Sequence, residues 1–412
     1  MGAATEGPQI ESLRIALVGP AEPRAFASEF PHDVASELPP GLGGVPVNDL
    51  GRALLDAGHR LVVVTGSRDV TSPRTFVGER LTIEVVPYRS RARHRALDLF
   101  RKERHGVTAA LENHNVDVIH AHWTYEFAWG ALASRLPVIV TAHDEPFAIL
   151  RRQTDIYRLI RLAMAVRVRL ATRNLTAVSP YLASSWRRRL FYRRPIAVVP
   201  NIAPFAPIQP STETTDTFVV LDVANDTALK NVTALVDAFA LVRRQIPEAA
   251  LVLAGPGLDE SDPFAVNLRA RGLAEQVTFV GIQDREGIRR LMGSATVLAH
   301  VSLEEAQPAV LVEAMAYNLA IVAGRSSGGC PWTLGDGSAG TLVDVRSPQQ
   351  IAQAIVAVHG TSPASRATSR AGHQLIVTRY SADVVVASYV AEYRSVVGSG
   401  HSRPRRAKRS GR

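Results

Sequence analysis

The sequence predicts an α/β protein with two domains, each built on a parallel β-sheet. The chain has 412 residues, which is too long for one ordinary hydrophobic core, so two domains of roughly 150–200 residues are expected. Short runs rich in β-branched residues alternate with helical stretches along the chain. Several of these runs are continuously apolar, as strands are when helices cover both faces of a parallel sheet.

The expected strands form two series. In the first half of the chain they lie at residues 13–19, 61–65, 81–87, 116–122, 137–143, 175–179 and 196–200. In the second half they lie at residues 217–223, 250–255, 277–281, 295–300, 320–323 and 341–343. Strands that alternate with helices of 10–15 residues form βαβ units, so each series is expected to build one open sheet. Ligands of such sheets bind beyond the carboxyl ends of the strands, and two facing domains would form a cleft there.

Domain boundaries follow from breaks in the periodic pattern. Three prolines and a stretch rich in Ser and Thr occupy residues 201–216, as expected of a linker. We therefore expect a first domain over residues 1–200 and a second over 201–397, closed by a helix over 381–397. Residues 398–412 carry clustered positive charge without periodicity and are expected to form a basic disordered tail.

Composition excludes several classes of protein. Hydrophobic residues make up 46% of the chain and charged residues 21%, which is typical of a folded globular protein rather than a disordered or fibrous one. No run approaches the ~18 apolar residues needed to span a bilayer, and residues 1–12 lack the pattern of a signal peptide. The single cysteine, Cys330, favours a reducing compartment. These features predict a cytoplasmic protein.

The basic charge is unevenly spread. The formal net charge is +9, yet the sequence has only three lysines, one of which is Lys230. Besides the tail, basic residues cluster in the stretch 151–173. This stretch can be an interfacial helix on an anionic membrane surface or a helix packed on the sheet, and both interpretations remain open. No nucleic-acid partner is expected.

Polar residues at strand ends are candidates for ligand contacts in the first domain. His120 and His122 end the fourth strand, and we expect them to point to opposite faces and so to form no metal pair. His143 and Asp144 follow the fifth strand, where a polar pair after a buried strand needs a partner in the crevice. Gly43 and Gly44 precede a helix, whose N-terminal N–H groups favour anions.

Charged residues at strand ends are the candidates in the second domain. Lys230 lies between the first strand and the helix that follows, where a positive charge can meet a phosphate. Glu305 follows another strand, and Glu313 lies in an apolar helical stretch where an ionised carboxylate needs a partner. The two glutamates are about 80° apart around an ideal helix, so they would contact different parts of one extended ligand.

These elements, taken in order, resemble the family-4 glycosyltransferases of the GT-B fold. The resemblance is carried by GLGG, DVIHAHW, TAHD, LTAVSP, VVPN, LKN, LAGPG, VTFVG and the E-x7-E pattern within EEAQPAVLVEAMA. It extends from about residue 13 to 396. It implies a GT-B fold, with two facing Rossmann-like domains and an inter-domain cleft.

The resemblance also implies roles for individual residues. Lys230 would neutralise the donor diphosphate, Glu305 would contact the hydroxyls of the transferred sugar, and Glu313 would contact the ribose. His143 would lie beside the reacting face of the sugar. Further family positions are expected at the nucleotide (Gly255, Gly257, Val280 and Gly281) and between donor and acceptor (Gly43 and Gly44). The strand-end residues His122 and Asp144 are further candidates on the acceptor side.

Three positions depart from the family pattern. Asn225 stands where the family has an arginine five residues before the lysine, which removes one formal charge from the diphosphate site. Residues 306–308 read Ala-Gln-Pro in place of a Gly-Phe-Gly-like stretch, and Trp332 replaces a glutamate in GGCPW.

The resemblance implies transfer of a hexose from a nucleotide diphosphate sugar to an acceptor hydroxyl, with retention of configuration. The acceptor is expected to be a glycan, a lipid-linked sugar or a small molecule. The chain has no Asp-x-Asp pair, so we expect no metal and no cofactor. A retaining glycosidase fits less well, because it needs two carboxylates about 5 Å apart. A sugar-nucleotide epimerase and a non-catalytic sugar-nucleotide-binding or lipid-associated subunit remain alternatives.

Overall fold

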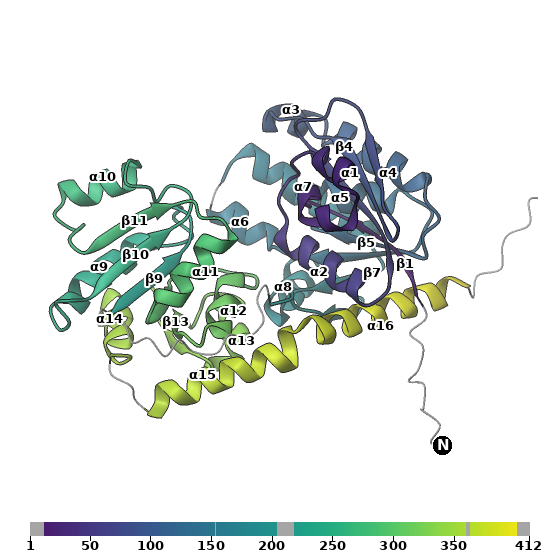
Figure 1. Cartoon of the computed structure of the whole chain (residues 1–412). Helices are drawn as coiled ribbons and strands as arrows, with labels where there is room; N and C mark the ends of the chain where they lie inside the picture. The colour runs from purple at the N-terminus through teal and green to yellow at the C-terminus, as the bar shows by residue number, and fades with distance from the viewer. Residues whose placement is uncertain (1–11, 153, 204–217, 360–362, 402–412) are drawn as a thin grey trace, which may run out of the picture.

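The computed structural model describes residues 12–152, 154–203, 218–359 and 363–401. Within these ranges the chain forms two α/β domains, and a long C-terminal helix runs along both of them (Figure 1). The predicted fold class of two parallel-sheet domains is confirmed. The predicted linker lies mostly outside the described residues, and so does the tail from residue 402 onward.

The first sheet has eight strands in the order β3-β4-β2-β1-β5-β6-β7-β8. Their bounds are β1 Arg14–Val18, β2 Arg60–Ser67, β3 Arg74–Val77, β4 Leu81–Pro87, β5 Val118–His122, β6 Val138–Ala142, β7 Asn174–Ala177 and β8 Ile196–Val198. All seven predicted strands are present, and β3 was not predicted. β3 is a short antiparallel edge strand, and its sequence RTFV has neither the length nor the apolar run of a central strand.

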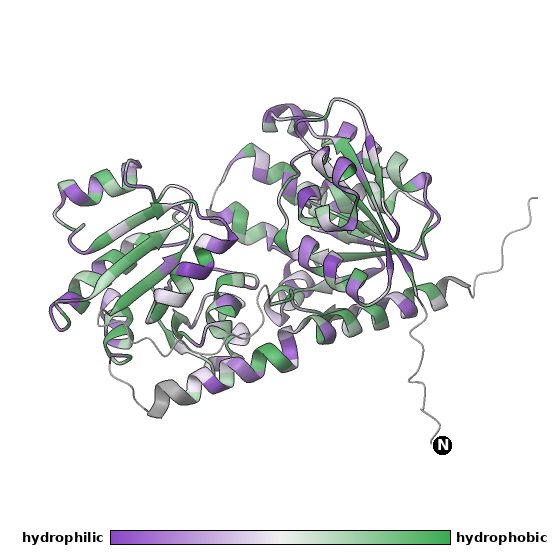
Figure 2. Ribbon diagram, viewed as in Figure 1, coloured by the Kyte–Doolittle hydropathy of each residue, from purple (hydrophilic) through white to green (hydrophobic). Residues whose placement is uncertain are grey.

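Helices cover both faces of this sheet (Figure 1). Their bounds are α1 His32–Ser36, α2 Val45–Asp56, α3 Ala92–Leu97, α4 Arg101–Glu112, α5 Glu126–Leu132, α6 Pro146–Arg152, α7 Ile156–Ala171 and α8 Pro180–Arg189. Every residue of β5 and β6 is buried, which explains why apolar residues predominate in both strands. Figure 2 shows the same pattern, with hydrophobic strands inside and hydrophilic positions mainly on the helices.

The second sheet has six parallel strands in the order β11-β10-β9-β12-β13-β14. Their bounds are β9 Val219–Val223, β10 Ala250–Ala254, β11 Val277–Gly281, β12 Val297–His300, β13 Ala320–Gly324 and β14 Thr341–Val343. The helices are α9 Val232–Arg243, α10 Pro263–Ala270, α11 Arg285–Ser294, α12 Ala309–Ala316, α13 Cys330–Thr333, α14 Pro348–Val356 and α15 Pro363–Leu375. All six predicted strands form, each within one or two residues of its expected ends.

The last helix, α16 (Ala382–His401), follows the second domain in the sequence but packs on the first (Figure 1). A π-helical turn at Ile376–Tyr380 leads into it. Tyr389 and Tyr393 belong to the same hydrophobic cluster as β1 and β2. The expected boundary at residue 397 therefore needs correction, because the apolar face of α16 is buried by the first domain and the helix continues to His401.

Side chains connect the two domains where the carboxyl ends of their strands meet. Tyr181 of α8 donates a hydrogen bond to Glu304, and Arg151 of α6 lies 3.7 Å from the same carboxylate. On the other side, Arg285 of α11 pairs with Asp49 of α2 at 3.1 Å. Strand-end residues of one domain therefore face helices of the other.

None of the helices in the described ranges combines the length and the apolar composition needed to cross a bilayer.

Candidate functional site

Lys230 and Glu305 form an ion pair at the carboxyl end of the second sheet. Lys230 precedes α9, and its Nζ donates to Oε1 of Glu305, which follows β12. The same carboxylate oxygen lies 3.1 Å from Nε2 of His300, the last residue of β12. Oδ1 of Asp222, on the neighbouring strand β9, lies 3.8 Å from Nδ1 of His300. The structure thus brings two predicted residues together and adds two that were not predicted.

The electrostatics of this group follow from burial and from opposite charges. Burial alone would raise the pKa of Glu305, but the hydrogen bond and charge of His300 and the charge of Lys230 outweigh it and lower this pKa to about 2. Burial alone would lower the pKa of His300, but Asp222 and Glu305 raise it above the ordinary value. Glu305 is therefore ionised at neutral pH.

Glu313 lies in α12, the helix that follows the loop of Glu305. Burial raises its pKa to about 7, against the opposing charge of Arg285 and together with the like charge of Asp49. Arg285 and Asp49 pair with each other, and no hydrogen bond or ion pair of the Glu313 side chain is found in the described part of the chain. This half-buried carboxyl group therefore has no side-chain partner within those residues.

A row of histidines crosses the carboxyl edge of β5 and β6. The rings of His120 and His122 are 4.1 Å apart, so the expectation that they point to opposite faces was wrong. Residues two apart on a strand share a face. Nδ1 of His122 lies 2.9 Å from Nε2 of His143, and His143 also stacks on Trp123 with ring centroids 4.3 Å apart. Tyr393 of α16 anchors the row, because its hydroxyl lies 2.7 Å from Nδ1 of His120.

The histidines of this row are neutral at physiological pH. Burial lowers the pKa of His143 to about 3. Burial, with the neighbouring His143, also lowers the pKa of His120 to about 3. Burial and the other two histidines lower the pKa of His122. A neutral imidazole at this edge can donate or accept a hydrogen bond without bringing a charge to the site.

Asp144 lies next to His143, after the end of β6. It accepts a 2.8 Å hydrogen bond from Tyr125, and Arg161 of α7 lies over the Tyr125 ring at 3.5 Å from its centroid. Burial raises the pKa of Asp144 to about 6, although Arg161 opposes the shift. Arg161 also pairs with Glu126 at 3.0 Å. This network connects the strand end of β6 with α5 and α7.

A cavity of about 490 Å³ opens at this carboxyl edge. Gly41 and Leu42 of the glycine loop border it, next to Gly43 and Gly44. Its charged lining comprises Arg68, Asp69, Arg95, Glu126 and Arg161. Because Arg161 is paired with Glu126, the arginines leave a positive balance in a polar pocket.

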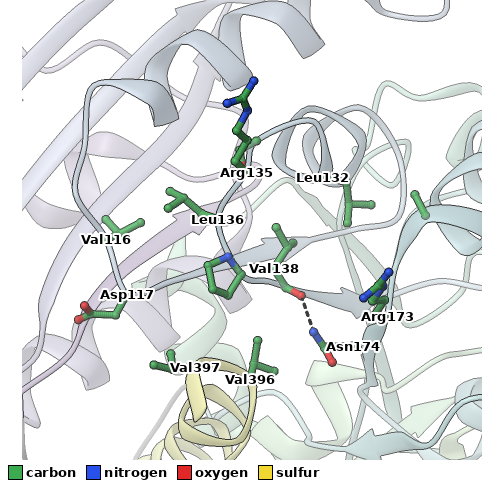
Figure 3. Close-up of a pocket in the computed structure, with 13 residues that line it drawn as sticks. Val116, Asp117, Leu132, Arg135, Leu136, Val138, Arg173, Asn174, Val396 and Val397 are labelled. Carbon is green, nitrogen blue, oxygen red and sulfur yellow. Dashed lines mark hydrogen bonds between the residues drawn. The ribbon is translucent and has the colours of Figure 1, made fainter. Parts of the chain in front are cut away.

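Another cavity, of about 600 Å³, lies at the opposite, amino-terminal edge of the first sheet (Figure 3). Val116, Leu136 and Val138 line it together with Val396 of α16. None of the predicted site residues lines this cavity. It is therefore separate from the chemistry described above.

Two glycines explain why the loops approach each other so closely. Gly44 caps α2 at φ 80°, where a Cβ would lie 1.9 Å from the Pro20 carbonyl oxygen. Gly255 has φ 133°, and a Cβ there would lie 1.8 Å from the Ala224 carbonyl oxygen. Both positions therefore require glycine.

The loop after β10 lies against the loop that carries Lys230. The N–H of Asp226 donates to the carbonyl of Pro256 at 2.9 Å, and the N–H of Gly255 donates to that of Gly281 at 2.7 Å. Gly257 packs against Asp226, and Val280 accepts from the Gln283 side chain. The predicted nucleotide residues are thus gathered beside the lysine loop.

The positions that depart from the family pattern have local partners. Oδ1 of Asn225 accepts a 2.7 Å hydrogen bond from Thr227 and stabilises the turn before Lys230. Gln307 accepts from the N–H of Asn201 at 2.8 Å. Trp332 carries Arg379 over its ring, 4.8 Å from the centroid, and fixes the π-helical turn before α16.

The structure leaves the predicted groups in two clusters. Lys230, Glu305 and the loops of Gly255 and Gly281 belong to the second domain, whereas His122, His143, Asp144 and the glycine loop of Gly43 and Gly44 belong to the first. No hydrogen bond, ion pair or ring contact joins His143 to Lys230 or Glu305 within the described ranges. Among these residues, no group of three or more His, Cys, Asp or Glu side chains could hold a metal ion.

Comparisons with known proteins agree with this arrangement. Residues 43–203 match the model of Glycosyltransferase Family 4, and residues 207–374 match that of Glycosyl transferases group 1. A D-inositol 3-phosphate glycosyltransferase of Mycolicibacterium smegmatis is 32% identical over 162 residues, which are 38% of this chain and 36% of that protein. The chain therefore matches about a third of the length of this relative.

Solved structures share the architecture. Sucrose-phosphate synthase from Thermosynechococcus elongatus superposes with a TM-score of 0.75 at 18% identity, covering 94% of this chain and 100% of that one. Anabaena HepE, solved with UDP and glucose, gives a TM-score of 0.67 at 18% identity, covering 93% and 100%. The two family matches together span most of the sequence and meet at the domain boundary. The chain belongs to the family-4 glycosyltransferases of the GT-B fold.

Proposed function

We propose that this glycosyltransferase moves a hexose from a nucleoside diphosphate sugar to an acceptor hydroxyl, with retention of configuration. The observation that carries the proposal is the Lys230–Glu305 pair at the carboxyl end of the second sheet. A cation and an ionised carboxylate at this edge match the two ends of a sugar diphosphate, because the phosphates need positive charge and the sugar hydroxyls need acceptors.

The donor would lie across the second domain. Its diphosphate would contact Lys230, its sugar hydroxyls Glu305, and its ribose the carboxyl group of Glu313. The close approach of the loops at Gly255 and Gly281 favours backbone contacts to the nucleotide. The Anabaena HepE structures contain UDP and glucose, which supports a nucleotide sugar as the donor.

The acceptor would occupy the 490 Å³ cavity of the first domain. The positive balance of its arginines favours an acceptor that carries phosphate beside its hydroxyl groups. The names of the Mycolicibacterium relative and of others state D-inositol 3-phosphate, a polyol of this kind. A phosphate-bearing polyol is therefore the acceptor class we propose. A lipid-linked acceptor with a head group of this kind belongs to the same class.

Catalysis would rest on charge stabilisation and positioning. Lys230 stabilises the charge that develops on the departing diphosphate, and Glu305 fixes the sugar. His143, which is neutral, would hydrogen-bond the sugar without competing for the phosphates. A phosphate oxygen of the donor would accept the acceptor's proton on the same face, which gives retention.

Two other functions make different predictions. A non-catalytic binding subunit is favoured by Asn225, which lacks the charge of the family arginine, and it would bind the donor without turnover. An epimerase would convert the donor without any acceptor. Transfer that requires an acceptor and releases a nucleoside diphosphate excludes both.

We expect Lys230→Ala to lower kcat by roughly 10²- to 10³-fold, because one charge-stabilising contact to the leaving group is lost. The assay is release of nucleoside diphosphate in a screen of UDP-, GDP- and ADP-sugars with phosphorylated polyols. Lys102→Ala is the matched control, because Lys102 is an exposed lysine on α4, and it should retain full activity. The activity should also survive EDTA. Complete loss on chelation, or an unchanged kcat in Lys230→Ala, would contradict the proposed site.

We expect Glu313→Gln to stabilise the protein at pH 8 and to weaken donor binding. The pKa of Glu313 rises from 4.5 to about 7 on folding, so burial of this carboxyl costs stability as the pH rises through that interval. The gain should be about 1–3 kcal/mol at pH 8 and small at pH 4.5. Urea unfolding at both pH values and titration with nucleoside diphosphate measure the two effects. An equal stability change at both pH values would show that the buried charge is not the cause.

We also propose that α7 rests on an anionic membrane surface, which would place the enzyme at the cytoplasmic face. The packed-helix interpretation is supported by Met164, Ala165 and Val168, which are buried. The opposite side of α7 nevertheless exposes an apolar stripe, in which Ile156 is 76% and Leu170 65% exposed. The helix carries four arginines and no carboxylate, a pattern suited to anionic lipid.

We expect the double variant Ile156→Gln with Leu170→Gln to lose flotation with phosphatidylglycerol-containing vesicles that the wild type shows. Glutamine keeps helix propensity but removes the apolar contact. Val266→Gln on α10, which is also an exposed apolar residue on a helix, should float like the wild type. Equal flotation of all three proteins, or none by the wild type, would contradict membrane binding through α7.

A further inference from the structure

Two buried ionisable residues behind the site have no part in the mechanism above. Asp222 lies inside the apolar strand β9 and is 0% exposed, and His300 ends β12 and is 1% exposed. A carboxylate at such a position is costly unless a cation compensates it. The two carboxylate oxygens of Asp222 have no hydrogen-bond partner in the described structure, so its compensation comes from charge.

The compensating charge is His300, which lies between two carboxylates. Its Nδ1 faces Asp222 at 3.8 Å, and its Nε2 faces Glu305 at 3.1 Å. Lys230 also binds this Glu305 oxygen. Burial raises the pKa of the Cys330 thiol in α13 and keeps it protonated. The charges of Glu305 and Lys230 also act on this thiol.

With both carboxyl groups ionised, the charges of this chain of groups balance when His300 is protonated. Burial would lower the pKa of His300, but Asp222 and Glu305 raise it. Two carboxylates, one imidazolium and one ammonium then sum to zero. A neutral His300 would leave one buried negative charge without a partner.

Donor binding disturbs this balance, because the mechanism asks Lys230 to contact a diphosphate. If Lys230 leaves Glu305, a largely buried carboxylate loses a counter-ion, and loss of one partner from a buried pair is strongly unfavourable. Asn225 carries no charge that could replace it. A second cation already in contact with Glu305 removes most of this cost.

We propose that His300, which faces Asp222 at 3.8 Å, is a positioning residue that serves as the counter-ion of Glu305 when Lys230 moves to the donor diphosphate. The inference rests on the proposed function, because it assumes that Lys230 meets the diphosphate. It assigns roles to two residues outside the family motifs described above. It also explains why an aspartate lies within an apolar strand.

A double-mutant cycle on nucleoside diphosphate affinity tests the proposal. The ligand is UDP, GDP or ADP, whichever the donor screen releases, and calorimetry gives the Kd. We expect His300→Gln to weaken binding by roughly tenfold in the presence of Glu305, a typical coupling between two sites. In the Glu305→Gln background, where no charge needs compensation, the same change should alter Kd by less than about twofold.

The pH dependence adds an independent readout. Wild-type affinity should fall as the pH rises through the pKa of His300, because the counter-ion is then lost. Asp222→Asn should move this fall to lower pH, since one of the carboxylates that raise the pKa is gone, and His300→Gln should abolish it. A purely structural role of the pair would not move the pH profile.

A matched control distinguishes the specific effect of removing His300 from the general effect of removing a buried histidine. His59 is also 1% exposed, in the first domain, and His59→Gln should leave nucleoside diphosphate affinity unchanged. Equal effects of His300→Gln in both backgrounds would overturn the inference but not the proposed function. If the wild type binds no nucleoside diphosphate, the proposed function fails first.

Discussion

The pairing of Glu305 with cations is the constraint on which the rest of the site depends. A carboxylate at the edge of a buried sheet is stable only when positive charge lies within contact distance, and here Lys230 and His300 share one of its oxygens. That requirement fixes the loop before α9 against the loop after β12. It also links Lys230 to the role proposed above, in which this lysine meets a phosphate while His300 stays in contact with Glu305.

The two sheets position the partners of this pair. Parallel strands end at one edge, so residues that follow β9 and β12 converge although they are far apart in sequence. The first domain presents the histidine row of β5 and β6 at its own carboxyl edge, and α16 supports that row through Tyr393. Helix α16 follows the second domain in the sequence, yet it contacts the histidine row of the first domain. Contacts such as Arg285 with Asp49 keep the two edges facing each other.

Much of the fold could be predicted because buried parallel strands have an unmistakable apolar pattern. The edge strand β3 escaped prediction, since an exposed antiparallel strand is short and partly charged. The packing of α16 on the first domain was not predicted either, because the order of elements along the chain does not reveal which domain buries the apolar face of a helix. Within the site, motifs predicted Lys230, Glu305 and Glu313, but not the partners that influence the pKa values of the two glutamates. Asp222 did carry a signal, as the one charge within the apolar run TFVVLDV, and His300 closed the adjacent strand.

The most direct test of this account is a crystal structure with a nucleoside diphosphate sugar or its nucleoside diphosphate product. We predict that a phosphate oxygen lies within hydrogen-bond distance of Lys230 Nζ, that the Lys230–Glu305 contact is lengthened, and that His300 stays in contact with Glu305. A diphosphate bound away from Lys230, or a Lys230–Glu305 pair left intact beside a bound diphosphate, would contradict it.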